Sequence, residues 1–375
     1  MDFTNDRESR GQVIASIERA VKRYSDYRYV VNSQSSKIKY KVILTKLGWT
    51  CSCPDHKFRG VKCKHIFAVE FSRAVRETVK EQVIIKPISQ LSCRYCNSEH
   101  IVKKAIRRNK LYNIQRYLCK DCGKRFSFNI GFEKMRAPPD AITSAMQLYF
   151  TGESFRNVMR FLELRGVKVS HVAVYKWIRK YVTLMQSYVE KIKLHSLGES
   201  WRTDELYVKF KGNMKYMYAI MDDETRYWIA QQVAGTKYTA DIRPLFRKAK
   251  EVAGKRPNVL ISDGARNYDV AFRHEFATIR SPRTRHISHI RLQGDRNNNK
   301  MERLNGEVRD REKVMRGLKI VNTSVLPGYQ LYHNFLRPHE GIGDQTPAEK
   351  CGVRIEGENK WMTLIQNALR KDKDI

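Results

Sequence analysis

The fold is decided by a stretch that begins WRTDELYVKF (201–210), continues as KYMYAIMD (215–222) and reaches RYWIAQQVAG (226–235). Each segment is rich in β-branched and aromatic residues, and the short polar turns KGN and DDET separate them. Such segments are typical of strands, so we expect a three-stranded meander. TADIRPLFRKAKEVAG (239–254) follows with apolar residues at helical spacing, which predicts a helix.

A second group of elements follows this meander. PNVLISDG (257–264) is an apolar run that predicts a buried strand with the carboxylate of Asp263 at its C-terminal tip. A further strand is expected near TRHISHIRL (284–292), and MERLNGEVRDREKVMRGLK (301–319) predicts a long helix. This order of strands and helices is that of the RNase H-like α/β fold, so we expect a core with a mixed five-stranded sheet.

Three acidic residues take positions that this fold brings together: Asp204 on the first strand, Asp263 after the fourth, and Glu302 on the late helix. An isolated acid is more often a solvated surface residue, so the prediction depends on their combination with the order of elements. Displacement at a phosphodiester suits about two Mg²⁺ or Mn²⁺ ions per active site, held by carboxylates. Arg309 follows Glu302 by two helical turns, on the same face, where it can meet a phosphate.

Composition points to a polyanionic partner. Among 375 residues, 72 Lys and Arg face 39 Asp and Glu, which leaves a net charge of +33. Nucleic acid is the first candidate, and a merely solvated surface or a basic membrane-surface protein are the alternatives. No apolar run approaches a membrane span and the N-terminus is charged, so we expect a cytoplasmic, nucleoid-associated protein of a prokaryote with no membrane partner.

The first cysteine cluster consists of Cys51, Cys53, Cys63 and His65, four ligands of the kind that close a tetrahedral zinc site. RYVVNSQ and KIKYKVILTK precede it and predict a hairpin, and a helix is expected from His65 onward. A chance set of structural thiols is the alternative. The CxC and CxH pattern resembles the SWIM-type zinc finger, a module associated with DNA binding or protein contacts.

The second cluster is a pair of CxxC knuckles, and it predicts a four-cysteine zinc ribbon. The two clusters together imply about two Zn²⁺ per chain. Tyr112, Tyr117, Phe126 and Phe128 are expected to fill the ribbon's small core rather than stack on bases. The knuckles are Cys93 with Cys96 and Cys119 with Cys122, and the expected phosphate contacts between them are Lys103, Lys104, Arg107, Arg108 and Lys110.

Three short helices are predicted after the ribbon, over 141–152, 155–166 and 171–185, with Ser154 and Ser170 as caps. They suggest a helix-turn-helix, and a plain bundle that links domains is the alternative. In the third helix we expect Val172, Val174 and Ile178 to pack inward. The residues expected on its DNA face are His171, Tyr175, Lys176 and Arg179.

Four stretches resemble the DDE-type transposases of bacterial and archaeal insertion sequences, in the branch related to retroviral integrases. They are WRTDELYVKFKG, LISDGARNY, NNKMERLNGEVRDREKVMRG and YHNFLRPHEGIGDQTPAEKCG. The resemblance implies that Asp204, Asp263 and Glu302 are the catalytic triad, that Arg309 is its accompanying basic residue, and that Asn299 and Asn305 position substrate or water. The SWIM-like finger is an addition that many relatives lack.

The resemblance further implies binding of double-stranded DNA at terminal inverted repeats, hydrolysis to a 3′-hydroxyl, and strand transfer into target DNA by at least a homodimer. Two alternatives are a structure-selective nuclease on the same fold and a catalytically silent DNA-binding regulator. We expect a multi-domain α+β chain. Its parts are a SWIM-type domain (1–85), the ribbon (90–135), the helix-turn-helix (137–190), the catalytic domain (198–352) and a C-terminal tail (353–375). Cys351, alone in its segment, is expected to be a buried, inert thiol.

Overall fold

The chain forms two compact units, Met1–Glu81 and Gln82–Ile375, so the first unit ends slightly before the boundary expected at 85. A computed structural model gives the structure. The residues that it describes are 3–17, 20–25, 27–34, 36, 38–45, 48–78, 82–88, 92–109, 111–279, 283–288, 299–315, 318 and 323–369.

The first unit is a four-stranded antiparallel sheet with helices. Tyr29, Val31 and Val42 are fully or almost fully buried, and they pack with Ile14 and Ile66 of two helices into one core. The predicted hairpin is confirmed, because its two strands pair directly. The elements are α1 (Phe3–Ser16), β1 (Val21–Ser25), β2 (Arg28–Asn32), β3 (Lys39–Thr45), β4 (Gly48–Cys51), α2 (Pro54–Arg59) and α3 (Lys64–Thr78).

The second unit begins with a three-stranded antiparallel ribbon, made of β6 (Ile101–Arg108), β7 (Asn113–Cys119) and β8 (Arg125–Ser127). Its small core contains Phe126, against which Tyr117 and Phe128 pack. These three aromatic residues are in the core, as predicted, whereas Tyr112 lies outside this cluster.

Three helices follow: α4 (Pro139–Thr151), α5 (Phe155–Leu164) and α6 (His171–Val189). The expected caps are confirmed, since the hydroxyls of Ser154 and Ser170 accept backbone N–H groups of the first turns of α5 and α6. Val174 and Ile178 are buried, but Val172 is 46% exposed. The prediction for Val172 was wrong, because residues two apart on a helix point to nearly opposite sides.

A mixed five-stranded sheet forms the centre of the second unit, in the order β11-β10-β9-β12-β13. β9, β10 and β11 are antiparallel, while β12 and β13 run parallel to β9. The predicted RNase H-like core is confirmed. Its elements are β9 (Ser200–Phe210), β10 (Asn213–Asp222), β11 (Trp228–Ala234), α7 (Thr239–Ala253), β12 (Val259–Ile261), α8 (Arg266–Glu275), β13 (Arg285–Ile287) and α9 (Asn299–Met315).

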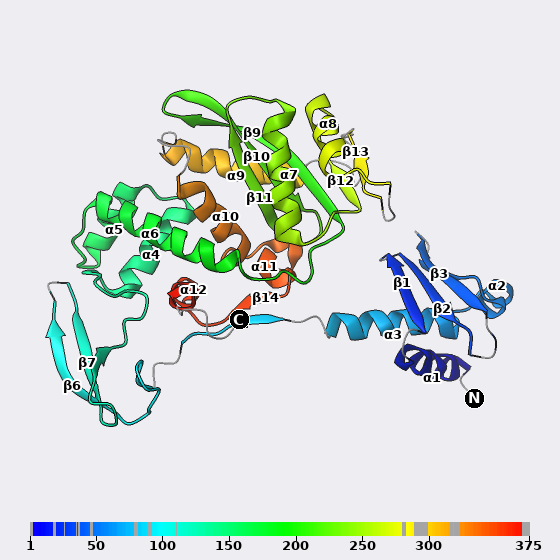
Figure 1. Ribbon diagram of the computed structural model, residues 1–375, viewed down its shortest axis with the longest axis horizontal. Helices are drawn as coiled ribbons and strands as arrows, with labels where there is room; N and C mark the ends of the chain where they lie inside the picture. Colours follow the sequence, from blue (N-terminus) through cyan, green and yellow to red (C-terminus); the bar gives the residue numbers. More distant parts are fainter. Residues whose placement is uncertain are drawn as a thin grey trace. The chain divides into compact units, whose positions relative to one another are not determined.

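Helices cover both faces of this sheet (Figure 1). On one face α7 packs on β10 and β11 and also contacts α8, while on the other α9 packs along β9 and α10 (Val325–Phe335) along β11. Because alternate residues of a strand point to opposite faces, neighbouring residues of β9 meet different helices. Asp204 and Glu205 therefore leave the strand toward opposite faces.

The segment after residue 352, expected as a tail, is folded. β14 (Val353–Ile355) pairs in parallel with β5 (Val83–Ile85), and α12 (Lys360–Leu369) packs against α4 and α6. The short helices η1 (Glu340–Ile342) and α11 (Pro347–Lys350) precede β14. Gly328 of α10 permits close packing, because a Cβ there would lie 2.5 Å from the ring of Phe150 in α4. The helices and the sheet are therefore one packed unit.

Within the described ranges, no helix combines the length and the apolar character that crossing a membrane requires.

Candidate active site and metal centres

Asp204 lies on the central strand β9 and faces α9. Its Oδ2 accepts a hydrogen bond from Nδ2 of Asn305 at 3.0 Å, and its Oδ1 accepts one from the backbone N–H of Glu205 at 2.9 Å. Burial, together with the charges of Glu205, Asp263 and Glu302, raises the pKa of Asp204 to about 7. A carboxylate held among other carboxylates is a site that a divalent cation would stabilise.

Asp263 follows β12 by two residues and lies beside Asp204, because β12 is the direct neighbour of β9 in the sheet. Carboxylate oxygens of Asp204, Glu205 and Asp263 all lie within 4.8 Å of one another. Glu302, on the first turn of α9, is exposed and stands outside this group, although its charge acts on Asp204. The structure thus brings two of the three predicted acids together and places the third on the helix that faces them.

Arg309 is exposed on α9, seven residues after Glu302 and on the same side of the helix. Asn299 is also exposed, at the start of α9. Asn305, in contrast, is 3% exposed, and among the described residues its Oδ1 has no hydrogen-bond partner. Of the two asparagines that flank Glu302 in the sequence, Asn305 is therefore the one in contact with the acids.

Glu205 is an acid of the site that the sequence analysis did not single out. It faces the opposite side of the sheet, where Nζ of Lys237 donates to its Oε1 at 2.6 Å and the hydroxyl of Tyr268 to its Oε2 at 2.8 Å. A cation and a hydroxyl already satisfy this carboxylate, so it fits a positioning role better than a metal-binding one. Its position directly after Asp204, together with strand alternation, was the available signal.

The first cysteine cluster has the geometry of a tetrahedral metal site. All four predicted ligands, Cys51, Cys53, Cys63 and His65, are buried with their ligand atoms within 4.8 Å of one another. Nδ1 of His65 lies 3.9 Å from the sulfur atoms of both Cys51 and Cys63. The contact with Cys51 lowers the pKa of Cys63 to about 4, which favours the thiolate that binds zinc.

The second cluster brings Cys93, Cys96, Cys119 and Cys122 together in the same way. Sulfur atoms of Cys93 and Cys122 are 3.6 Å apart, and those of Cys96 and Cys119 are 3.5 Å apart. These distances exceed a disulfide bond of about 2.05 Å and approach the edge of a ZnS₄ tetrahedron, about 3.8 Å for Zn–S bonds of about 2.3 Å. Both donor sets fit zinc.

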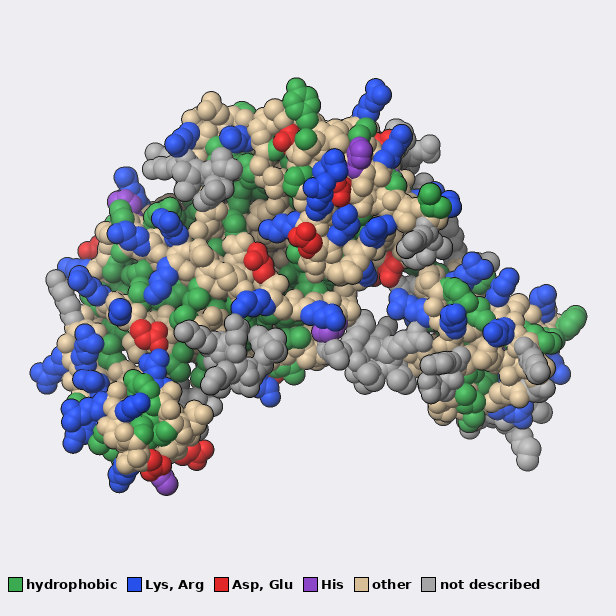
Figure 2. All heavy atoms as spheres, viewed as in Figure 1, with side chains coloured by type: hydrophobic (Ala, Val, Ile, Leu, Met, Phe, Trp, Pro, Cys, Tyr) green, Lys and Arg blue, Asp and Glu red, His purple; other side chains and the backbone are tan. Residues whose placement is uncertain are grey.

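Basic side chains gather over the ribbon (Figure 2). Lys103, Lys104, Arg107 and Arg108 of β6 are all exposed, and Lys110 lies outside the described residues. On α6, His171, Lys176 and Arg179 are exposed, whereas Tyr175 is half-buried with its ring edge-on to Phe155. The predicted residues therefore offer a cationic surface, except Tyr175, which contributes to packing.

We expect metal analysis of the purified chain to find about two zinc ions. Cys96→Ser should lose one of them, because a four-thiolate site does not close with three thiolates. Cys351→Ser is the matched control, since Cys351 is buried away from both clusters with its thiol 3.4 Å from the Thr225 hydroxyl. Loss of zinc from the control, or retention of both ions by Cys96→Ser, would contradict the assignment.

Asp204→Asn should raise the melting temperature at neutral pH without divalent cations. The pKa of Asp204 is 3.8 in the unfolded chain and about 7 in the folded one. Between these two pH values the folded state binds a proton that the unfolded state has lost, so the free energy of unfolding falls as pH rises from 3.8 to about 7. The gain should be about 1 to 4 kcal/mol, fading toward pH 4. Thermal melting measures it, with the exposed Asp310→Asn as control. A less stable Asp204→Asn protein at neutral pH would refute this account of the site.

Two protein-family models match the chain. A DDE domain model of the IS240 transposase type matches residues 198–339, which include the sheet and both aspartates, and a SWIM zinc finger model matches residues 40–74, which include the first cysteine cluster. The predicted finger and the predicted DDE domain are confirmed.

The chain is also similar to several known proteins and solved structures. Transposases of the Staphylococcus aureus elements IS431mec and IS257 are 32% identical over 136 residues, which are 35% of this chain and 58% of theirs. The chain thus spans little more than half the length of these relatives. The HTLV-2 integrase catalytic core with magnesium matches with 12% identity and a TM-score of 0.31, covering 41% of this chain and 96% of that one. A simian T-cell lymphotropic virus intasome matches 43% of this chain and 56% of its own, with 15% identity and a TM-score of 0.33. From the family models and the topology, residues 198–339 are a DDE domain of the IS240 transposase type, in a chain that also carries a SWIM zinc finger.

Proposed function

We propose that this protein is a DNA transposase that binds the terminal inverted repeats of a mobile element, cleaves there and joins the freed ends to target DNA. The observation that carries the proposal is the carboxylate pair formed by Asp204 on β9 and Asp263 just after the adjacent strand β12 of an RNase H-like sheet, with α9 and its Glu302 nearby. The match of these residues to a DDE domain supports the same chemistry.

In this proposal Asp204, Asp263 and Glu302 hold divalent cations. Bound Mg²⁺ would supply activation of the attacking oxygen and stabilisation of the leaving oxygen. Asn305 orients Asp204 through its amide, Lys237 and Tyr268 keep Glu205 directed to the other face, and Arg309 contacts a phosphate beside the acids. Glu302 is exposed on the first turn of α9, and we propose that its carboxylate joins the aspartates when a cation binds.

DNA binding is assigned to the ribbon and the three helices before the core. The exposed cations of β6 and α6 support this assignment, as does the net charge of +33. In the helix-turn-helix that we propose, α6 is the recognition helix, with His171, Lys176 and Arg179 on its free face. Two ends must be held together for joining, so the active form is proposed to be at least a dimer.

Asp263→Asn should abolish cleavage while leaving DNA binding intact. With Mg²⁺ and a duplex carrying the inverted repeat that flanks the gene, the parent should nick the strand and join it to a second DNA, and the variant should lose about 10³-fold or more of this rate. Asp269→Asn, a partly exposed aspartate of α8 paired with Arg273, is the matched control. A parent that binds the ends tightly but never cuts them would favour a catalytically silent regulator.

Replacing Lys103, Lys104, Arg107 and Arg108 together by alanine should weaken binding to every DNA sequence. If each cation contacts one phosphate, the slope of log K against log salt should become shallower by about 3.6, that is about 0.9 for each of the four contacts. Replacing Arg273 and Lys313, exposed cations already paired with Asp269 and Asp310, is the control: it removes two surface charges outside the ribbon and should leave the slope unchanged. An unchanged slope in the ribbon variant would exclude the ribbon from the DNA interface.

A further inference from the structure

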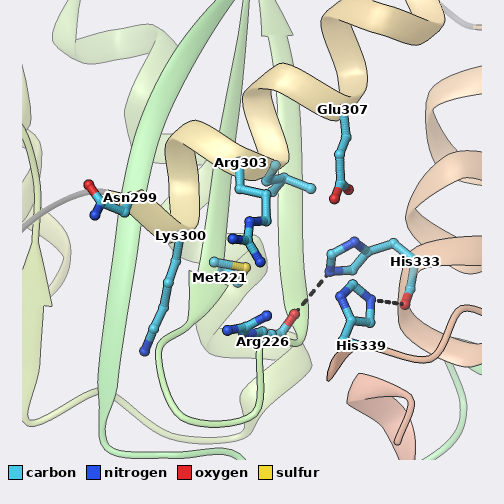
Figure 3. A pocket seen from close by; sticks show the side chains of 9 residues that line it. Met221, Arg226, Asn299, Lys300, Arg303, Glu307, His333 and His339 are labelled. Carbon is cyan, nitrogen blue, oxygen red and sulfur yellow. Dashed lines mark hydrogen bonds between the residues drawn. The ribbon is translucent and has the colours of Figure 1, made fainter. Parts of the chain in front are cut away.

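A small pocket lies against α9 (Figure 3), and Glu302 is not among the residues that line it. It has a volume of about 200 Å³ and is enclosed by α9, the turn between β10 and β11, α10 and the loop at His339. Ordinary ligand pockets measure roughly 300–1,000 Å³. This pocket therefore suits one small chemical unit rather than a whole cofactor.

Two arginines supply positive charge to the pocket. Arg303 extends from α9 toward Arg226 of the turn (Figure 3), and neither guanidinium has an ion pair or hydrogen bond among the described residues. In contrast, Lys300 is bound to Asp223 at 2.8 Å and Glu307 to Arg337 at 2.6 Å. The two guanidinium groups are the cations left for an anion from outside, and their planar donors match a phosphate.

The backbone of Arg226 and the neighbouring Gly341 together fix where the Arg226 side chain lies. Its backbone has φ of 59°, in the left-handed region that non-glycine residues rarely adopt. A Cβ on Gly341 would overlap the Arg226 guanidinium where it now lies, so the glycine leaves room for this side-chain position. Backbone strain of this kind persists where the surroundings enforce it and is frequent at binding sites.

His333 of α10 contributes a hydrogen-bond acceptor. It is 3% exposed, and its Nε2 lies 3.0 Å from the carbonyl oxygen of Arg226. A carbonyl only accepts, so Nε2 carries the proton, and burial lowers the pKa of His333 to about 3, which keeps the ring neutral. Nδ1 is then a buried acceptor with no partner among the described residues. A ligand that also donates an N–H or O–H would satisfy it.

We propose that this pocket binds one unpaired nucleotide of the DNA substrate, with its phosphate on Arg226 and Arg303 and a base N–H donated to Nδ1 of His333. Met221 and Leu304, both 2% exposed, supply apolar contacts for the base. A nucleotide has a phosphate for the two arginines, a base N–H for His333 and a flat apolar base face for Met221 and Leu304. The inference rests on the proposed function, because it takes DNA as the substrate.

The pocket and the acids of the proposed active site share α9, so the distance between them can be estimated from the geometry of this helix. Arg303 directly follows Glu302 and so lies about 100° around the helix from it. With side chains, a helix is about 10–12 Å across, and a strand advances about 3.4 Å per nucleotide. A strand that crosses α9 from the acids would therefore reach the pocket after about two to four nucleotides. A base bound there must leave the duplex stack.

The test compares binding of the full chain, with Ca²⁺ in place of Mg²⁺, to a paired duplex and to the same duplex with a short unpaired arm. 2-Aminopurine in the arm reports by its fluorescence on unstacking of the bound base. The parent should prefer the forked DNA by about tenfold, and Arg303→Gln and Arg226→Gln should each remove most of this preference. Arg303→Lys should restore part of it, because charge without the planar fork is a poorer match to phosphate.

Arg354→Gln, which removes an exposed arginine of β14, is the matched control and should keep the full preference. Melting curves check that each variant folds. The proposal is overturned if the parent shows no preference for the fork, or if the two pocket variants retain it. The cleavage assay, with Asp263→Asn as its inactive control, separates the two proposals. If the parent cuts no DNA but has a fork preference that depends on Arg303, the proposed enzyme activity is refuted and the pocket is not. If the parent cuts DNA without that preference, the pocket alone is refuted.

Discussion

The site depends on the burial of one carboxylate between β9 and α9. Asp204 is hydrogen-bonded to Asn305 across this interface, and three other acids act on it electrostatically. Burial and like charge both oppose ionisation of Asp204, and a divalent metal bound at the proposed site would offset both effects. The helix α9 must therefore pack on β9 both to complete the core, through Met301, Leu304 and Val308, and to present Asn305 to the acid.

Ion pairs distinguish two acids of the proposed site from other acids of the second unit. Several buried or half-buried acids are neutralised by one or more cations, whereas Asp263 and Glu302 form no ion pair among the described residues. The net charge of +33 belongs to the rest of the surface, which it makes attractive to DNA, while the unpaired acids of the site are left to divalent cations. The neutralised acids are Glu205 with Lys237, Asp223 with Arg202 and Lys300, Glu275 with Arg243, Arg247 and Lys250, and Glu307 with Arg337.

Most of the correct predictions came from local sequence patterns, that is, from ligand spacings and from the composition of single strands. The CxC, CxH and CxxC spacings determine which side chains converge, because ligands so near in sequence have few other geometries open to them. The strands from 201 to 235 and the strand before Asp263 follow from β-branched and aromatic composition. The pairing of β5 with β14 joins segments about 270 residues apart, and no local signal encodes it. The positions of Glu302 and Val172 depend on helix rotation, which composition fixes only loosely.

One helix links the proposed chemistry to the proposed nucleotide pocket. Glu302, Asn305 and Arg309 lie along one side of α9, and Arg303 and Glu307 along another, while Leu304 and Val308 fix the rotation of the helix through the core. A change in this rotation would move the acid and the arginine together, since both are attached to the same rigid element. Packing of α9 therefore couples the geometry of the metal ligands to that of the pocket, and a strand held at Arg303 is held at a defined distance from Asp204.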